Sequence, residues 1–417
     1  MLDLTSFDAA LKEYYTDDAV EDMTYKNNPL YALMPKNEKF FGEYKVIPII
    51  YGNPQGRSAT FSRAQARGLA TSSYLKKFSV TRVKDYSIAT IDNETLLASQ
   101  NDRGAFLSAA TLEIDGCIHS LTRSLATDMY RSGYGSRGTI ATSSFGVTTL
   151  TLNDINDIVN FEVGMELVVS ATEAANTLRA LGSSTNGLIV TGVNRVLGTL
   201  TFGFNVNDAT NGIPTIAQND HLFVRGDRED SATPARTKIA GLRAWVPDAA
   251  PASTAFFGMD RTSDVTRLGG LRYDASAMPI EEGLIEGAAL VGREGGMIDH
   301  FFMSFDKYSA LEKALGSKVQ YVDLAANARI SFRGIRVNGP NGEIRVLPDQ
   351  NCPSTRCFGV ELKTWELASI GKAVRVIDTD TLEMLRLNSS DGVEVRYGFY
   401  GNVCCNAPGR NINIQLA

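Results

Sequence analysis

The sequence has no long apolar run and few of the residues that usually build a catalytic or metal site. No apolar stretch in its 417 residues approaches the roughly 18 needed to cross a bilayer. Its three histidines, His119, His221 and His300, are far apart and have no partners at metal-ligand spacing. A GK[ST] phosphate loop, a GxGxxG turn after a strand and a nucleophile elbow are missing as well. These absences argue against a membrane-spanning protein and a zinc or nucleotide-binding enzyme, and no cofactor is predicted.

Cysteine is also scarce. Five cysteines in so long a chain are too few for a disulfide framework, which predicts a reducing compartment. Cys352 and Cys357 are close in sequence, and Cys404 and Cys405 are adjacent. Free thiols are favoured, with a Cys352–Cys357 disulfide and a four-thiol zinc site as alternatives. The Gly-rich stretch at 292–296 follows a predicted helix, whereas a phosphate loop would precede one, so it predicts a helix-ending loop.

The chain lacks the positive charge expected of a protein that holds DNA by neutralising phosphates. Its formal net charge is -6, from 41 basic and 47 acidic side chains. Residues 1–42 carry four basic and eight acidic side chains, whereas residues 43–91 carry eight basic and two acidic ones. A basic segment on an acidic body is suited to contacting a neighbouring copy, because opposite potentials orient the encounter. A solvated basic loop is the alternative interpretation.

The first 91 residues predict two segments with little core of their own. A helix is expected around Phe7, Ala10, Leu11 and Tyr14, followed by an irregular stretch with two prolines that needs another surface to pack on. From Val46 to Ile91 the pattern predicts a long antiparallel hairpin, KVIPIIYG running in and SYLKKFSVTRVKDYSIATI running out, with a tip rich in Gly, Ser, Ala and Arg. Neither face of the outgoing strand is apolar enough for a core strand, so we expect the hairpin to lie on another subunit.

A long helix is predicted next. Asp92, Asn93 and Glu94 predict a helix start, and after a break at 101–104 a longer helix runs to about Ser132. Its apolar residues form one continuous stripe: Ile114, Ile118, Leu121, Leu125 and Met129. His119 falls on this helix and is expected to be packed. Gly133 is placed to end the helix, which has the length of a spine.

The remaining sequence predicts an all-β module and a mixed α/β part. Short runs separated by Asn, Asp and Gly predict a β module over 138–228: VTTLTL, GMELVV, GLIVTGV, GTLTF and HLFV. Over 240–390, EEGLIEGAALVG and FDKYSALEKALG predict helices, and RISFRGIRV and GEIRVLP predict a hairpin joined at 338–342. The last 25 residues predict two strands that return to the spine helix.

The order of these parts resembles the major capsid protein of tailed bacteriophages, which has the Hong Kong 97-type fold. NPLYALMPK, PIIYG and the Ser/Arg-rich tip look like that family's N-terminal arm and extended loop, and GLRAWVP and SFDKYSALEKALG look like its axial domain. The resemblance implies an α+β fold with five parts. They are an N-terminal arm (1–42), an extended hairpin loop (43–91), a peripheral domain with the spine helix (92–137 and 391–417), an inserted β-rich domain (138–230) and an axial domain (231–390).

The resemblance implies a mechanical function and no enzymatic activity. Many copies would form hexamers and pentamers that close into an icosahedral shell around packaged double-stranded DNA, without sequence-specific binding and without a membrane. The short N-terminus implies a separate scaffolding protein, and a portal and a decoration or cement protein are further expected partners. The chain would be located in the virion after assembly in the host bacterial cytoplasm. Its predicted subunit-interface residues are Arg57, Arg63, Arg67, Lys76 and Lys77 on the hairpin, and Pro29 and Tyr31 in the arm.

Two other functions remain as alternatives. A tail or receptor-binding component of the virion would use the β-rich middle for binding, but would not need a spine helix and a basic hairpin. A glycosidase would need two carboxylates held together, and no pattern in the sequence places them so.

Some members of the family that the sequence resembles join a hairpin lysine to an asparagine covalently. By that resemblance, Lys76 or Lys77 would supply the amine.

Overall fold

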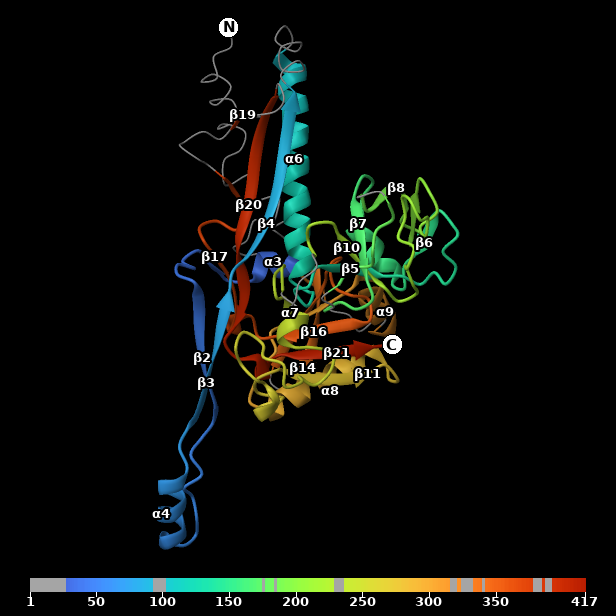
Figure 1. The fold of residues 1–417 in the computed structure, drawn as a ribbon. Coiled ribbons are helices and arrows are strands. Elements are labelled where there is room, and N and C mark those ends of the chain that lie inside the picture. The colour runs from blue at the N-terminus through green and yellow to red at the C-terminus, as the bar shows by residue number, and fades with distance from the viewer. Residues whose placement is uncertain are drawn as a thin grey trace.

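The protein, described here from a computed structural model, consists of a long spine, a projecting hairpin, a β-rich side module and a mixed α/β body (Figure 1). The structure describes residues 28–92, 103–174, 177–183, 186–228, 236–315, 321–323, 333–339, 342–377, 385–386 and 392–417. The helix predicted around residues 7–14 lies outside these ranges.

The spine is the helix α6 (Arg103–Asp128), whose 26 residues correspond to about 39 Å. All five residues of the predicted stripe are at most 2% exposed, which confirms the spine helix and its buried face. Gly133 follows with a φ of +88°, in the left-handed region that favours glycine. Asp92, predicted to start a helix, instead ends strand β4, and residues 93–94 lie outside the described ranges.

Two long strands run beside this helix (Figure 1). β4 (Val83–Asp92) pairs antiparallel with β20 (Gly392–Cys405), from Val83–Gly401 to Asp92–Gly392. β20 also pairs with β17 (Trp365–Ser369), β18 (Arg375–Val376) and β19 (Leu385–Arg386), and the short β1 (Lys36–Asn37) adds in parallel to β17. The short helix α3 (Pro29–Leu33) precedes β1.

The predicted hairpin is present but shorter than expected. β2 (Tyr44–Gly52) pairs antiparallel with β3 (Tyr74–Thr81), and the tip forms the helix α4 (Phe61–Ala70), an element that the sequence pattern did not predict. The prediction of one outgoing strand to Ile91 is wrong, because β4 leaves the hairpin to pair with β20. The break at Arg82 is fixed by its hydrogen bond to the Phe40 carbonyl and by Asn402 donating to the Thr81 carbonyl.

The body is a seven-stranded sheet in the order β11-β21-β16-β12-β15-β14-β13, with the helices α8 and α9 packed against it. Its elements are β11 (Leu271–Ala275), α8 (Ile280–Arg293), β12 (His300–Met303), α9 (Phe305–Leu315), β13 (Tyr321–Asp323), β14 (Arg333–Gly339), β15 (Gly342–Pro348), β16 (Arg356–Val360) and β21 (Ile412–Leu416). The two predicted helices and the β14–β15 hairpin are confirmed. α8 ends at Arg293 and is followed by Gly295 at a φ of +81°, as expected of a helix-ending loop.

One prediction about the C-terminus is wrong. β20 returns to the spine as expected, but β21 joins the body sheet between β11 and β16. The short 3-10 helix η5 (Pro408–Arg410) redirects the chain after β20. Ile412 and Ile414 are then buried in the core of the body, and removing their apolar surface from water stabilises β21 in this sheet.

The side module is an inserted six-stranded sheet in the order β5-β10-β7-β8-β9-β6. Its elements are β5 (Ser136–Thr139), β6 (Thr149–Thr151), the 3-10 helix η1 (Ile155–Asn160), β7 (Glu166–Ser170), β8 (Leu188–Asn194), β9 (Thr199–Phe202) and β10 (His221–Val224). All five predicted β runs are therefore strands. A bridge between Ile140 and Leu152 brings the two edge strands together, so the sheet curls around a core of its own.

The central core lies where the spine, the hairpin root and the body meet. The short helix α7 (Leu242–Trp245) contributes Trp245, which is fully buried there. Two further 3-10 helices are η2 (Thr262–Asp264) and η4 (Leu362–Thr364). Within the described residues, no helix combines the length and the hydrophobicity required to span a membrane.

Candidate subunit interface

The inner face of the hairpin is anchored to its own chain. Phe78 and Val80 on β3 are 0% exposed, and Ile47 and Ile49 on β2 are buried with them. The Phe78 ring packs edge-on against Trp245 at 5.0 Å between centroids. The expectation that this hairpin has little core of its own is therefore wrong for its root, because the alternation of β3 places Phe78 and Val80 on one buried face.

The outer face of the same two strands is apolar and open to solvent. Ile50 is 64% exposed and Leu75, its cross-strand partner, is 60% exposed. Val46 and Tyr44 continue this exposed surface along β2, and Lys77 stands opposite Pro48. Apolar side chains that gather on one exposed face in this way are typical of a surface that another chain covers.

The helix α4 at the end of the hairpin has no buried residue at all. Phe61 is 83% exposed and Leu69 is 86% exposed. Thr71 holds the helix end by donating its hydroxyl to the Arg67 carbonyl at 2.7 Å, and the same hydroxyl accepts from the Gln55 amide at 3.1 Å. A helix of 10 residues with no packed face is marginal in water, so α4 needs a partner surface.

The basic residues of the hairpin fall into two groups. Arg57, Arg63, Arg67 and Lys77 are exposed, and no acidic residue occurs between Glu43 and Asp85 in the sequence to neutralise them locally. Lys76 differs, because its Nζ donates to the Asp260 carbonyl at 3.0 Å and to Ser263 Oγ at 2.5 Å. Of the five basic residues predicted at an interface, four are open to another chain and Lys76 is held by its own.

Pro29 and Tyr31 lie elsewhere. Both are buried in α3, against the core of their own chain. Lys36 covers the Tyr31 ring, with its Nζ 4.6 Å from the ring centroid. The structure therefore does not bring these two residues together with the basic residues of the hairpin.

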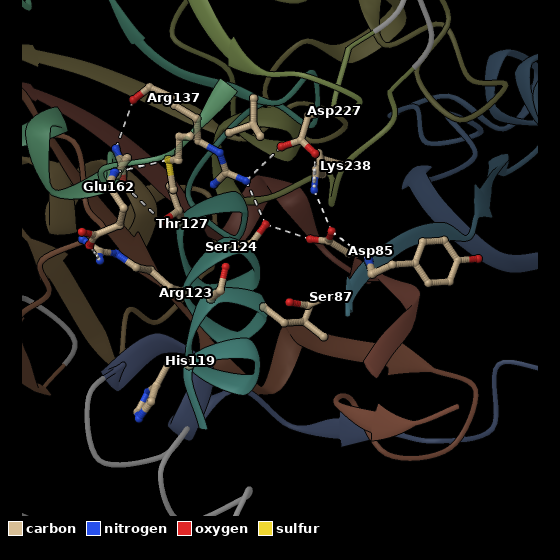
Figure 2. Close-up of a pocket in the computed structure, with 17 residues that line it drawn as sticks. Asp85, Ser87, His119, Arg123, Ser124, Thr127, Arg137, Glu162, Asp227 and Lys238 are labelled. Atoms are coloured by element: carbon tan, nitrogen blue, oxygen red, sulfur yellow. Dashed lines mark hydrogen bonds and ion pairs between the residues drawn. The ribbon is translucent and has the colours of Figure 1, made fainter. Parts of the chain in front are cut away.

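A second polar feature lies where the inserted module meets the spine helix. Five charged residues, three of them buried and two partly buried, come from different elements and are here called the junction cluster: Asp128, Arg137 and Lys238, with Asp85 and Asp227. Lys238 Nζ lies 2.9 Å from Asp85 Oδ1 and 2.8 Å from Asp227 Oδ1. Figure 2 shows Arg137 and Lys238 pointing toward Asp227, with Ser124 between Arg137 and Asp85.

The junction cluster lies beside a pocket of about 370 Å³ between β4, α6 and the inserted module. His119, Arg123 and Glu162 line the side of this pocket away from the cluster (Figure 2). Arg123 pairs with Glu162, so the charged groups around the pocket are already partnered within the chain. The sequence does not predict this cluster, because its members lie up to 153 positions apart and belong to no shared motif.

The histidines and cysteines form no site within the described residues, where no group of three His, Cys, Asp or Glu side chains is placed to hold a metal ion. All five cysteines are buried free thiols, and burial raises the pKa of Cys404 to about 12. His300 is buried beside Arg345, which together with desolvation lowers its pKa to about 4. His119 is exposed on α6, contrary to the expectation that it is packed.

Comparison with known proteins found a solved structure that is similar to nearly the whole chain. No protein-family model and no curated protein matches the sequence. A solved chain of the cyanophage A-1(L) capsid asymmetric unit is similar over 94% of this chain and 93% of its own, with a TM-score of 0.52 and 12% identity. The chain has a phage capsid fold.

Two further solved structures align with lower TM-scores. A structure of Mycobacterium phage Ogopogo has a TM-score of 0.43 and 8% identity, and covers 94% of this chain and 92% of its own. An encapsulin complex from Synechococcus elongatus has a TM-score of 0.44 and 7% identity, over 93% and 87%. Within the capsid fold of the present chain, the hairpin and α4 project away from the body and from the inserted module (Figure 1).

Proposed function

We propose that this chain is the major capsid protein of a tailed bacteriophage, with the Hong Kong 97-type arrangement of arm, extended loop, peripheral, inserted and axial domains. In this proposal, hexamers and pentamers of the chain close into an icosahedral shell around packaged double-stranded DNA. The observation that carries it is the projecting hairpin of a capsid-fold chain, anchored on its inner face while its outer face and α4 remain uncovered.

The geometry supports a simple mode of assembly. The buried pair of Phe78 and Trp245 fixes the root of the hairpin, so that its tip is held in one direction. A neighbouring copy then covers Ile50, Leu75 and the apolar residues of α4. Burying these side chains stabilises the contact by about 25 cal/mol for each Å² of apolar surface removed from water.

Charge directs the same contact. Arg57, Arg63, Arg67 and Lys77 present unneutralised positive charge on a chain whose net charge is -6. We propose that they contact acidic surface on the next subunit, which orients the two copies before the apolar faces meet. A net negative chain suits a shell that confines DNA without a basic binding groove.

The same proposal includes the other partners and the location of the chain. A scaffolding protein guides assembly in the host bacterial cytoplasm, a portal occupies one vertex, and the finished shell is part of the virion. The inserted module, which lies on the side of the spine, is the part best placed to receive a decoration protein or to brace neighbouring subunits (Figure 1).

Assembly at different salt concentrations tests this function. The full chain is produced with its scaffold and examined by negative-stain microscopy and sedimentation, and closed shells or capsomer rings are expected. Raised ionic strength screens exposed charges, so assembly should slow as salt increases from about 0.05 to 0.5 M. Shells or rings that never form, with only a monomer or a trimer in solution, would contradict the function.

Charge reversal tests the interface residues. The double variant Arg63→Glu with Arg67→Glu should assemble at least tenfold more slowly while its monomer unfolds as the wild type does. Arg293→Glu is the matched control, since Arg293 is 70% exposed on α8 and outside the hairpin. Equal loss of assembly in both variants would argue against a specific role for the hairpin charges.

A further inference from the structure

The junction cluster contains more negative than positive groups. Asp85, Asp128 and Asp227 share two cations, Arg137 and Lys238. None of the five side chains is more than 16% exposed, so water screens the excess charge poorly. A buried cluster of this composition favours the uptake of one proton.

Asp128 is the carboxylate with the weakest partners. Its side chain is 1% exposed, and its nearest cation contact is Arg137 Nη1 at 3.3 Å from Oδ1. Asp85 and Asp227, by contrast, lie 2.9 and 2.8 Å from Lys238 Nζ. Among the described residues, Asp128 Oδ1 has no hydrogen-bond partner.

The position of Asp128 in the fold adds to this imbalance. It is the last residue of α6, where the carbonyl groups of the helix end carry partial negative charge. A carboxylate there is disfavoured, whereas a protonated carboxyl group is not. Burial, together with the like charges of Asp227 and Asp85, raises the pKa of Asp128 to about 6 despite the opposing effect of Arg137 and Lys238.

We propose that the junction cluster is a proton-dependent clamp, in which protonation of Asp128 balances the charge and tightens the attachment of the inserted module to the spine helix. Arg137 begins the module on β5, and Asp227 lies just after β10, where the module ends. Both ends of the module are thus held by the group of charges to which Asp128 belongs. The clamp is a property of the single chain and does not depend on assembly into shells.

The charged groups that act on Asp128 come from several elements. β4 contributes Asp85, β5 contributes Arg137, and Lys238 precedes α7. Arg123 and Glu162 neutralise each other on the far side of the pocket. His221 on β10 is hydrogen-bonded to Ser136, and burial lowers its pKa, so its charging in acid acts in the opposite direction.

The sign of the pH effect follows from the raised pKa. Asp128 has a pKa of about 6 in the folded chain against 3.8 when free, so the stabilisation is complete below about pH 4 and is lost as the pH rises through 6. Two pKa units correspond to a change of about 100-fold in the opening equilibrium of the junction. Above pH 7 the module should therefore detach from the spine more often than at pH 4.5.

Hydrogen exchange at the junction tests the clamp on the full chain. The amides of Lys238 and Leu242 donate to the carbonyls of Gly133 and Met129, so they report on whether the segment that carries Lys238 stays attached to the end of the spine. In the wild type, their protection factors should fall about 30-fold between pH 4.5 and pH 8, after correction for intrinsic exchange. In Asp128→Asn, which carries no charge to titrate, protection should stay constant across this range and exceed that of the wild type at pH 8.

Two further variants separate charge balance from simple loss of structure. Asp227→Asn leaves two carboxylates with two cations, so its pH dependence should also shrink, even if its absolute protection is lower. Asp115→Asn, a half-buried carboxylate on the same helix, should behave as the wild type. Parallel pH profiles in the wild type, Asp128→Asn and Asp227→Asn would overturn the proposal. His221→Gln should leave the loss above pH 6 intact, and abolition of that loss would assign the effect to the histidine.

Discussion

Residues of a single strand in the hairpin serve opposite purposes. Phe78 points inward and lies in edge contact with Trp245 and Phe256, at 5.0 and 6.1 Å between ring centroids. Leu75, three positions earlier, points outward and is 60% exposed. The backbone amide of Ser79 donates to the Phe257 carbonyl at 2.9 Å, which ties the inner edge of the strand to the body. Inner residues should therefore control the stability of the chain, and outer residues its association.

A pair of substitutions on β3 tests this division. Phe78→Ala should lower the free energy of unfolding by about 3–5 kcal/mol, because it leaves a cavity among packed aromatic rings. Leu75→Ser should change it by less than about 0.5 kcal/mol, since the side chain is already solvated. Urea denaturation of the unassembled chain measures the free energy of unfolding of both variants. In sedimentation of assembly mixtures, Leu75→Ser should reduce the extent of assembly by more than its small loss of stability explains. Equal destabilisation by the two variants would contradict the inner and outer assignment.

At the scale of elements, two glycines of the spine have opposite roles. Gly116 lies within α6, and Gly133 follows it. Gly116 lies on the exposed side of α6, and an added Cβ would meet nothing within 4 Å. Gly133 lies after the helix at a φ of +88°, where a Cβ would approach the Ala240 Cα and the Ile239 carbonyl oxygen to 3.2 Å. The amide of Lys238 donates to the Gly133 carbonyl, so this turn also connects the spine to the segment before α7. One glycine thus weakens the helix, and the other allows it to end.

Alanine at each position should change stability with opposite sign. Gly116→Ala should raise the free energy of unfolding by about 1 kcal/mol, the difference in helix propensity between the two residues. Gly133→Ala should lower it by about 2 kcal/mol, because the left-handed backbone and the close contacts both disfavour a Cβ. Thermal unfolding followed by circular dichroism at 222 nm compares the two with the wild type. Destabilisation by Gly116→Ala would show that its side of α6 is covered rather than open.

At the scale of the whole molecule, the described residues form three apolar core clusters. The inserted module has its own core cluster, which includes Leu167, Leu200 and Leu222, separate from the central core and from that of the body. Its contacts with the spine include the ion pair of Arg131 with Asp157 and the hydrogen bond from Thr127 to Asn160. A module with a complete core and a polar boundary is expected to fold by itself.

Expression of residues 136–228 alone tests that independence. The fragment should show a β-type circular dichroism spectrum and a single cooperative unfolding transition, since its first and last strands, β5 and β10, pair with each other. Leu200→Ala within the fragment should lower its stability by about 2–5 kcal/mol, and the exposed Leu197→Ala should not. A fragment that stays unfolded in buffer would mean that the spine helix completes its core.

Much of this fold could be predicted because short-range patterns carry it. The four- and three-residue spacing from Ile114 to Met129 predicts the spine and its buried face, and both are confirmed. Turn residues between short apolar runs predict the strands of the inserted module. The positive charge of the hairpin also follows from composition, since its residues 44–84 include no acidic side chain.

The errors arise where a residue's partner is distant in sequence. The alternation of β3 and β4 predicts two-sided strands but not that β3 pairs with β2 while β4 pairs with β20, more than 300 residues away. The terminal strand β21 has the same apolar alternation whichever sheet it joins, and the body core decides the choice.

The sequence by itself determined the spine helix and its buried face, the strands of the inserted module and the positive charge of the hairpin tip, because these depend on residues within a few positions of one another. Only the tertiary structure decided that Phe78 is buried, that Lys76 is held by Ser263 and that Asp128 shares two cations with two other carboxylates. Burial and ion pairing depend on distances in space, and the packing of remote segments sets those distances.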